Sequence, residues 1–351
     1  MMKIVLPGGS GQLGTLLAHA FHADGHEVVV LSREARPAPW RVVGWDGATL
    51  GPWAGELDGC DAVINLAGRS VNCRYNLENR REMIGSRVLS TRVVGEAIAR
   101  AARPPRTWLQ MSSATVYSHR FDAWNDEATG RLGTGEAESP RPWAFSVGIV
   151  RAWEDALASA RVPHTRRVAL RSSIVMRPER GGTFDVLLGL VRWGLGGTVG
   201  DGRQMVSWIH EDDFVRVVRW LLEHAEIDGV VNVTSPGSLP NAEFMRALRA
   251  AWGTPIGLPS PWPVLAMGAW MLRTEPELVL KSRWSYPGRL LERGFTFEWT
   301  RWPDAAVDLC RRWRHGTLER RLAPPVTARG TPARAARTRP PSRASGRGGA
   351  A

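Results

Sequence analysis

The chain has 351 residues, of which 43% are hydrophobic, and a formal net charge of +12. This length suffices for one large or two ordinary domains with a real hydrophobic core. Because no charged leader with an apolar segment precedes the first predicted strand, and no apolar run approaches the length of a bilayer, we expect a soluble, cytoplasmic protein with no membrane partner.

The first predicted strand, over residues 3–6, runs into the stretch PGGSGQLG at residues 7–14, here named the glycine loop, and then into a helix over residues 12–24. The spacing G-x-x-G-x-x-G is formed by Gly8, Gly11 and Gly14. A residue without a Cβ lets the backbone approach an anion, and the free N–H groups of a helix N-terminus supply donors. A second strand over residues 26–31 completes the βαβ unit that a dinucleotide-binding loop requires. The alternative is an ordinary glycine-rich turn.

The second predicted strand is followed by Ser32 and Arg33, at the place where a protein that prefers NAD usually offers an acidic side chain. A guanidinium forms a bidentate, charge-assisted pair with a 2′-phosphate, so these residues favour NADP. The alternative is a solvated surface arginine, and the neighbouring Glu34 weakens the case for NADP.

Strand and helix signals alternate along the first two thirds of the chain. Apolar runs typical of short buried strands lie at residues 41–45, 61–66, 107–113, 164–170 and 229–234. Helical patterns cover residues 80–101, 145–160, 213–225 and 241–252. Asp212 or Asp213 is well placed as the N-cap of the helix over residues 213–225. The alternation predicts an α/β fold with a doubly wound parallel sheet.

Two stretches depart from this pattern: residues 179–206 are glycine-rich around one apolar helix, and residues 236–315 are helical and rich in proline and tryptophan. We expect both to form a smaller, mostly helical substrate lobe over the carboxyl ends of the strands, beside a cofactor-binding domain over residues 1–235. The tryptophans of this lobe could pack in its core, which we favour, or line an aromatic substrate pocket. They include Trp252, Trp262, Trp270, Trp284, Trp299 and Trp302.

Much of the positive charge lies in a predicted disordered basic tail over residues 316–351, which is rich in Pro, Arg, Gly and Ala. From residue 317 onward eight arginines stand against one glutamate, a net charge of +7, which leaves +5 for the rest of the chain. The body has no basic patch interleaved with aromatics, so we expect no specific nucleic-acid partner. Whether the tail binds polyanions weakly stays open. The oligomeric state stays open as well.

The three cysteines, Cys60, Cys73 and Cys310, are odd in number and lack a C-x-x-C pairing with histidines. This pattern supports neither a disulfide framework nor a zinc site. We expect buried free thiols and no metal.

Several motifs resemble the extended short-chain dehydrogenase/reductase superfamily, the group of nucleotide-sugar epimerases and dehydratases. SSATVY, at the end of the fifth strand, is similar to its serine segment with Ser113 at the catalytic position, and ALRSSIVMRP and WIHEDDF are similar to later segments. Four stretches resemble one atypical branch, the epimerase-family proteins with a C-terminal domain of unknown function. They are VINLAGRSV, IGSRVLSTRVVGEAI, MVSWIHEDDF and YPGRLLERGFTFEW. The resemblance covers about residues 2–312 and implies a Rossmann fold that binds NADP.

This resemblance implies which residues contact NADPH. They belong to the glycine loop, the end of the second strand, the NLAG segment, the helix after it and the segment after the sixth strand: Gly8, Gly11, Gly14, Ser32, Arg33, Leu66, Ala67, Glu82, Arg87 and Val175. Each has a structural alternative, such as local pairing for Arg87 and core packing for Val175.

The resemblance breaks at the catalytic centre. The superfamily uses a tyrosine to pass a proton and a lysine four residues later to lower the pKa of that tyrosine. No such lysine follows any of the three tyrosines of this chain, which are Tyr75, Tyr117 and Tyr286, and the only lysines are Lys3 and Lys281.

The helix that should carry the pair has Phe145 or Ser146 at the tyrosine place and Ile149 or Val150 at the lysine place. The atypical branch is also without this pair, so its loss is no sign of a decayed gene.

Candidates for a substitute acid or base are few. They are His210, whose unperturbed pKa suits proton transfer, and the loop residues Asp126 and Glu127, although a structural role is favoured for each. We predict an NADP-binding oxidoreductase or epimerase-like enzyme that exchanges hydride with an unidentified carbonyl or alcohol substrate, with Ser113 as the catalytic hydrogen-bond donor. The alternative is a non-catalytic, NADPH-dependent binding or regulatory protein.

Overall fold

The computed structural model describes residues 1–34, 36–71, 73–133, 141–259 and 281–322. At its centre lies a seven-stranded, fully parallel sheet in the order β10-β6-β5-β4-β1-β2-β3. The chain builds β1, β2 and β3 outward and then returns to place β4 on the other side of β1, which confirms the predicted doubly wound α/β fold. The strands are β1 (Lys3–Pro7), β2 (Glu27–Ser32), β3 (Arg41–Gly44), β4 (Ala62–Asn65), β5 (Thr107–Ser113), β6 (Arg166–Ser172) and β10 (Gly229–Val233).

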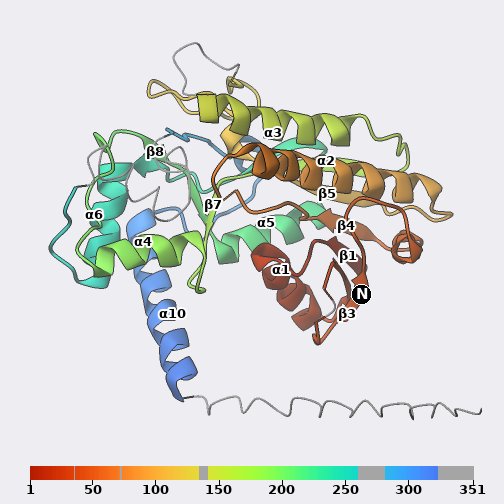
Figure 1. Ribbon diagram of the computed structural model, residues 1–351, viewed down its shortest axis with the longest axis horizontal. Helices are drawn as coiled ribbons and strands as arrows, with labels where there is room; N and C mark the ends of the chain where they lie inside the picture. Colours follow the sequence, from red (N-terminus) through yellow and green to blue (C-terminus); the bar gives the residue numbers. More distant parts are fainter. Residues whose placement is uncertain (35, 72, 134–140, 260–280, 323–351) are drawn as a thin grey trace, which may run out of the picture.

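Helices cover both faces of this sheet (Figure 1). α1 (Gln12–Ala23) and α5 (Glu211–Glu223) pack on one face, and α2 (Leu77–Arg100) and α3 (Arg141–Ala158) run side by side on the other. Successive residues of a strand point to opposite faces. Accordingly Ile4 packs in the core under α1 and α5, whereas Val5 packs in the core under α2.

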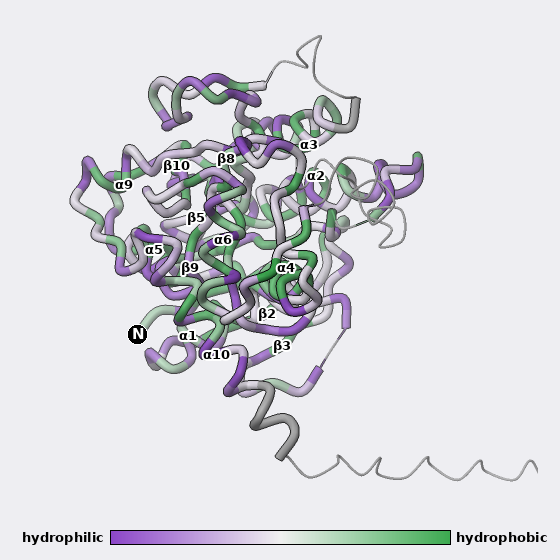
Figure 2. The backbone as a smooth tube through the Cα atoms, turned by 90° about the vertical axis from the view of Figure 1, so that its left-hand side faces the viewer, coloured by the Kyte–Doolittle hydropathy of each residue, from purple (hydrophilic) through white to green (hydrophobic). Residues whose placement is uncertain are grey.

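The C-terminal lobe is helical, as the sequence predicts, and it has its own hydrophobic core. It contains α4 (Thr183–Arg192), α6 (Asn241–Trp252) and α10 (Trp302–Leu322), grouped at one end of the sheet (Figure 1), and Figure 2 shows much of α4 as hydrophobic. Trp302 is 1% exposed, stacks on Phe244 at 4.0 Å between ring centroids and donates its indole N–H to the Phe244 carbonyl. This tryptophan is therefore a packing residue, as expected, whereas Trp262 and Trp270 lie outside the described residues.

Short elements that the sequence analysis missed join the lobe to the sheet. β7 (Ile174–Met176) pairs with β9 (Trp208–His210), β8 (Met205–Val206) pairs with β11 (Leu239–Pro240), and α9 (Gly288–Glu292) contacts β10. The 3₁₀ helices η1 (Pro52–Leu57) and η2 (Ala114–Val116) complete the described elements. Strands of two or three residues are too short for hydrophobic alternation to be read from sequence.

Two predicted boundaries are wrong. The N-cap of α5 is His210, whose Nδ1 accepts the Asp212 N–H, and neither Asp212 nor Asp213 caps the helix. The Asp213 carboxylate instead accepts the N–H groups of Glu298 and Trp299, so it joins α5 to a distant segment. The tail was predicted from residue 316, but α10 continues to Leu322; residues 323–351 lie outside the described part of the chain.

Burial raises the thiol pKa of Cys60 to about 12 and that of Cys310 to about 11, whereas Cys73 is only half-buried. All three are free thiols. Within the described ranges, no cluster of His, Cys, Asp or Glu could hold a metal ion, and no helix is both long and apolar enough to cross a bilayer.

Candidate functional site

The glycine loop fits so tightly against its neighbours that side chains are excluded at three positions. Gly8 has φ +74°, and a Cβ on it would lie 2.7 Å from the backbone N and Cα of Ala67. A Cβ on Gly9 would lie 2.8 Å from Leu6, and one on Gly14 would lie 2.4 Å from Gly9. Gly11 differs, because its nearest neighbour would be 3.6 Å away. Gly11 is exposed, so the space above its backbone is open to solvent.

The N-terminus of α1 faces this open space with free donors. Its N-cap, Gly11, has no side chain to accept from the helix, and no residue in the described ranges accepts the N–H groups of Gln12 and Leu13. Unpaired N–H groups and the helix dipole favour an anion at this position. A pyrophosphate fits the chemistry of the loop.

The end of β2 contacts the glycine loop directly. Ser32 is 2% exposed and its hydroxyl donates to Ser10 Oγ at 2.9 Å. Arg33 is exposed, and no carboxylate of the described residues pairs with it, because Glu34 forms its ion pair with Arg36 at 2.6 Å. The guanidinium of Arg33 is therefore available to an added anion, because the neighbouring Glu34 does not pair with it.

The segment after β4 lies against the same loop. The Leu66 N–H donates to the Pro7 carbonyl at 2.9 Å, and the Ala67 N–H donates to Oδ1 of Asn65 at 3.1 Å. Asn65 is fully buried and also donates to Gln110 of β5. These bonds hold Leu66 and Ala67 beside Gly8, as a shared cofactor surface requires.

Arg87 projects from α2 toward this segment. Its guanidinium carbon would be 3.2 Å from a Cβ on Gly68, it donates to the Met83 carbonyl at 2.9 Å, and it lies over the Trp153 ring at 5.0 Å. Burial lowers the pKa of Arg87 to about 10, which still leaves it charged at neutral pH. It has no carboxylate partner among the residues described.

The two remaining residues implied by the resemblance are less closely tied to the loop. Glu82 forms an ion pair with Arg69 at the surface. Val175 is the middle residue of β7, in register with Ile209. Two residues later Arg177 donates to the carbonyl of Gln12 and pairs with Glu211, which brings the end of β7 to the start of α1.

Ser113 is the last residue of β5 and is half-buried. Its Oγ accepts the N–H of Thr115 at 3.2 Å, while no acceptor for its own hydroxyl hydrogen occurs in the described part of the chain. Ser112 beside it has the opposite role, since its hydroxyl donates to Glu154 at 2.5 Å. Ser113 is therefore able to donate a hydrogen bond to a substrate oxygen.

Tyr117 is excluded as the missing phenol by its contacts. It is 3% exposed, its hydroxyl donates to Asn232 at 2.9 Å and accepts from Arg171 at 3.1 Å, and burial raises its pKa. Arg171 in turn forms a bidentate pair with Glu154 at 2.8 and 2.7 Å. This network beneath Ser112 is structural.

The other candidate acids and bases also have structural roles. His210 is fully buried, stacks on Trp299, and lies with Nε2 3.3 Å from Oδ2 of Asp308, and burial lowers its pKa. Asp126 accepts the N–H groups of residues 128 and 129. Glu127 accepts those of residues 232 and 289, and burial raises its pKa.

Two residues near the site were missed. Lys281 is 4% exposed and donates to the Thr115 carbonyl at 2.8 Å, just beyond Ser113. Tyr75 lies with its hydroxyl 3.4 Å from Ser146 Oγ. The scarcity of lysine and tyrosine in the sequence was the one available signal for either.

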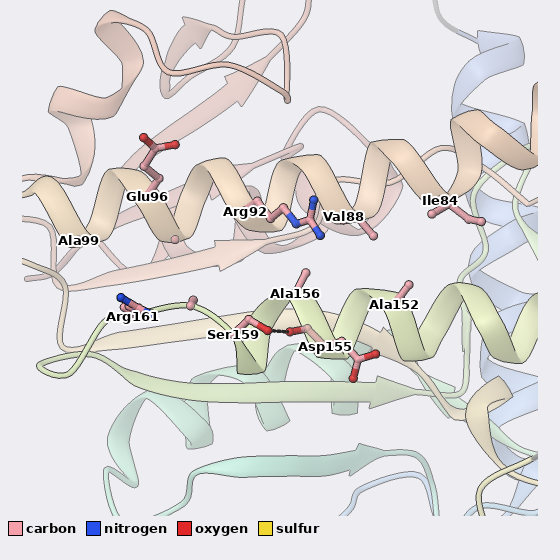
Figure 3. Close-up of a pocket in the computed structure, with 12 residues that line it drawn as sticks. Ile84, Val88, Arg92, Glu96, Ala99, Ala152, Asp155, Ala156, Ser159 and Arg161 are labelled. Atoms are coloured by element: carbon pink, nitrogen blue, oxygen red, sulfur yellow. Dashed lines mark hydrogen bonds between the residues drawn. The ribbon is translucent and has the colours of Figure 1, made fainter.

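A separate groove runs between α2 and α3 (Figure 3). It is lined by Ile84, Val88 and Ala156 together with the charged side chains of Arg92, Glu96, Asp155 and Arg161. None of the predicted cofactor or catalytic residues lines it. The groove is therefore distinct from the site at the carboxyl ends of the strands.

Comparison with known proteins gives consistent matches. A model described as the NAD dependent epimerase/dehydratase family matches residues 4–140. The epimerase family protein SDR39U1 of Homo sapiens is 34% identical over 302 residues, which are 84% of this chain and 95% of that protein. The epimerase family protein YfhF of Bacillus subtilis (strain 168) is 28% identical over 304 residues, 85% of this chain and 95% of that protein. The crystal structure of human SDR39U1 (isoform 2) with NADPH has a TM-score of 0.76 at 30% identity and covers 88% of this chain and 99% of its own.

Proposed function

Since this chain belongs to the NAD-dependent epimerase/dehydratase family, in the branch of the epimerase family protein SDR39U1, we propose that it binds NADPH and catalyses hydride exchange with a carbonyl or alcohol. The observation that carries the proposal is the pair of arginines beside the glycine loop. Arg33 follows Ser32, which bonds to Ser10 of the loop, and Arg87 lies beside Gly68, next to the Ala67 that contacts Gly8. Neither arginine has a carboxylate partner among the described residues. NADPH carries two matching sets of negative charge, the pyrophosphate and the 2′-phosphate.

The residues divide the binding task between them. The glycine loop and the N-terminus of α1 hold the pyrophosphate, with Arg87 as a nearby cation. Arg33 pairs with the 2′-phosphate, and Ser32 fixes the end of β2 to the loop through Ser10. When bound, the nicotinamide supplies or accepts a hydride.

Ser113 acts on the substrate. Its hydroxyl hydrogen is directed to the substrate oxygen, while its Oγ is held by the Thr115 N–H. A donor fixed in this way stabilises the negative charge that develops on a carbonyl oxygen.

A regulatory, non-catalytic role is the second candidate, and a specific observation favours it. Ile149 and Val150, at the place of the superfamily lysine, are each 4% exposed and packed in apolar clusters. Neither can move a proton. In this reading NADPH changes the surface that the C-terminal lobe presents to a protein partner.

Calorimetry with NADPH and NADH tests the cofactor assignment. We expect Arg33→Ala to weaken NADPH binding about tenfold or more, because a charge-assisted hydrogen bond contributes about 1.5 to 3 kcal/mol, and to leave NADH binding nearly unchanged. Arg293→Ala is the matched control, since Arg293 is an exposed arginine just after α9, beside β10 at the opposite edge of the sheet from β2 and β3. An equal loss of both cofactors in Arg33→Ala contradicts the assignment.

Identification of co-purified small molecules by mass spectrometry, followed by turnover assays with NADPH, tests the chemistry. Ser113→Ala should lower turnover about 100-fold while NADPH affinity stays within about threefold, because the hydroxyl acts mainly in the transition state. Ser159→Ala, just after the end of α3, is the control. Turnover that survives Ser113→Ala contradicts the role of the serine, and an NADPH-dependent protein partner without turnover favours the regulatory reading.

A further inference from the structure

Two places on α3 correspond to the tyrosine and the lysine of the superfamily, and no candidate for either place is a phenol or an amine. Phe145 or Ser146 stands at the tyrosine place, and Ile149 or Val150 stands at the lysine place. Val150 packs against Ala114, Val116 and Tyr117, the residues that follow Ser113. This turn of α3 therefore lies next to the serine segment, at the place where a proton donor is needed.

A tyrosine from a different element reaches the same turn of α3. Tyr75 lies in the loop between β4 and α2, and its hydroxyl is 3.4 Å from Ser146 Oγ. Its ring meets the Phe145 ring edge-on at 5.4 Å between centroids and packs in one cluster with Ile149. Tyr75 and Ser146 are each 7% exposed, so the pair has only limited contact with bulk water.

A half-buried cation, Arg87, lies near this tyrosine. Its guanidinium donates to the carbonyl of Met83, which packs in one cluster with Tyr75, and the charges of Arg87 and ionised Tyr75 attract each other. No carboxylate of the described ranges neutralises Arg87. A cation near a phenol favours the phenolate, which is what the superfamily lysine does for its tyrosine.

We propose that Tyr75, assisted by Ser146 and Arg87, is the proton donor of the reaction, a relocated replacement for the missing pair on α3. This inference rests on the proposed function. In carbonyl reduction the O–H bond of Tyr75 breaks, and its proton moves directly or across Ser146 Oγ to the substrate oxygen. That oxygen takes the electron pair of the C=O double bond as the hydride forms the new C–H bond. The phenolate on Tyr75 is stabilised by Arg87 and regains a proton from water, and alcohol oxidation reverses these steps.

Ultraviolet difference titration of tyrosinate near 295 nm tests the pair on the full chain, because only three tyrosines contribute. The difference between wild type and Tyr75→Phe isolates Tyr75, and Tyr286→Phe is the matched control. Removal of the cation in Arg87→Gln should move the midpoint assigned to Tyr75 about 1 to 3 pH units higher, and Arg87→Lys should restore it. Circular dichroism and melting temperature verify that each variant is folded.

The same titration with each cofactor form tests whether Tyr75 faces the reacting ring. NADP⁺ carries a positive nicotinamide that NADPH lacks, so the Tyr75 midpoint should be lower with NADP⁺ than with NADPH. This comparison needs only wild type and Tyr75→Phe, so it holds even where an Arg87 variant fails to fold.

These experiments distinguish a failure of Tyr75 as proton donor from a failure of NADPH binding. An unchanged Tyr75 midpoint in folded Arg87→Gln, no Tyr75 ionisation up to pH 11, or equal midpoints with both bound cofactor forms overturns Tyr75 as proton donor and leaves NADPH binding intact. Failure of calorimetry to detect either cofactor overturns the proposed function, and this inference with it.

Discussion

Gly8 packs so closely on Ala67 that a Cβ at Gly8 would lie 2.7 Å from the Ala67 backbone, and its φ of +74° is a conformation that other residues rarely adopt. Gly8→Ala therefore pushes the segment after β4 away from the glycine loop. We expect a loss of about 2 to 4 kcal/mol in the free energy of unfolding, from backbone strain and overpacking together. Urea denaturation measures it, and a loss below about 0.5 kcal/mol contradicts the described packing.

Gly11→Ala should behave in the opposite way. The added Cβ meets nothing closer than 3.6 Å, so the free energy of unfolding should change by less than about 1 kcal/mol. NADPH affinity should fall at least tenfold, because the methyl group occupies the space through which the pyrophosphate approaches the α1 N-terminus. Calorimetry checks the affinity, and unchanged binding would show that the phosphate lies elsewhere.

The buried pair of Glu154 and Arg171 supports the end of β5. Glu154→Gln leaves the Arg171 charge buried without its partner and also weakens the bond from Ser112, so we expect a loss of about 3 kcal/mol in stability. Glu96→Gln is the matched control, since its pair with Arg100 is exposed on α2 and should contribute less than about 0.5 kcal/mol. Equal losses in both variants would contradict a structural role for the buried pair.

Acid should destabilise the fold partly through His210. Burial and, less strongly, the charge of Arg312 lower the pKa of His210 in the folded state, and they outweigh the carboxylates of Asp212, Asp308 and Asp213, which raise it. Below the ordinary histidine pKa of about 6.5, the unfolded chain binds a proton at this histidine and the folded chain does not. The contribution of His210 to the free energy of unfolding is therefore complete above that pH and decreases as the pH falls.

Urea denaturation at pH 7 and pH 5 measures this effect. His210→Gln should lose less stability between the two pH values than wild type does, while His164→Gln, at an exposed position, should keep the wild-type difference. Equal pH dependence in wild type and His210→Gln would assign the acid sensitivity to other groups.

The fold was predictable because its signals are local. Apolar runs bounded by turn residues predict the buried strands, and the glycine loop follows β1 as expected. The errors arise where a side chain is used by a distant partner. Asp212, a good N-cap by type, pairs instead with Arg312, one hundred residues away, and leaves the cap to His210.

The candidate site was predictable in part for the same reason. Gly8, Ser32 and Ala67 belong to motifs contiguous in sequence, and the structure brings them together at the carboxyl ends of the strands. The contact of Tyr75 with Ser146 spans 71 positions and depends on how the loop before α2 folds onto α3. No local spacing encodes such a contact.

The central claim is that the glycine loop and Arg33 select NADPH. Isothermal titration calorimetry of the wild-type chain with NADPH and with NADH, in the same buffer, tests it most directly. We expect saturable NADPH binding with a Kd about tenfold or more below that of NADH, because only NADPH carries the 2′-phosphate. No NADPH binding, or equal Kd values for the two cofactors, would contradict it.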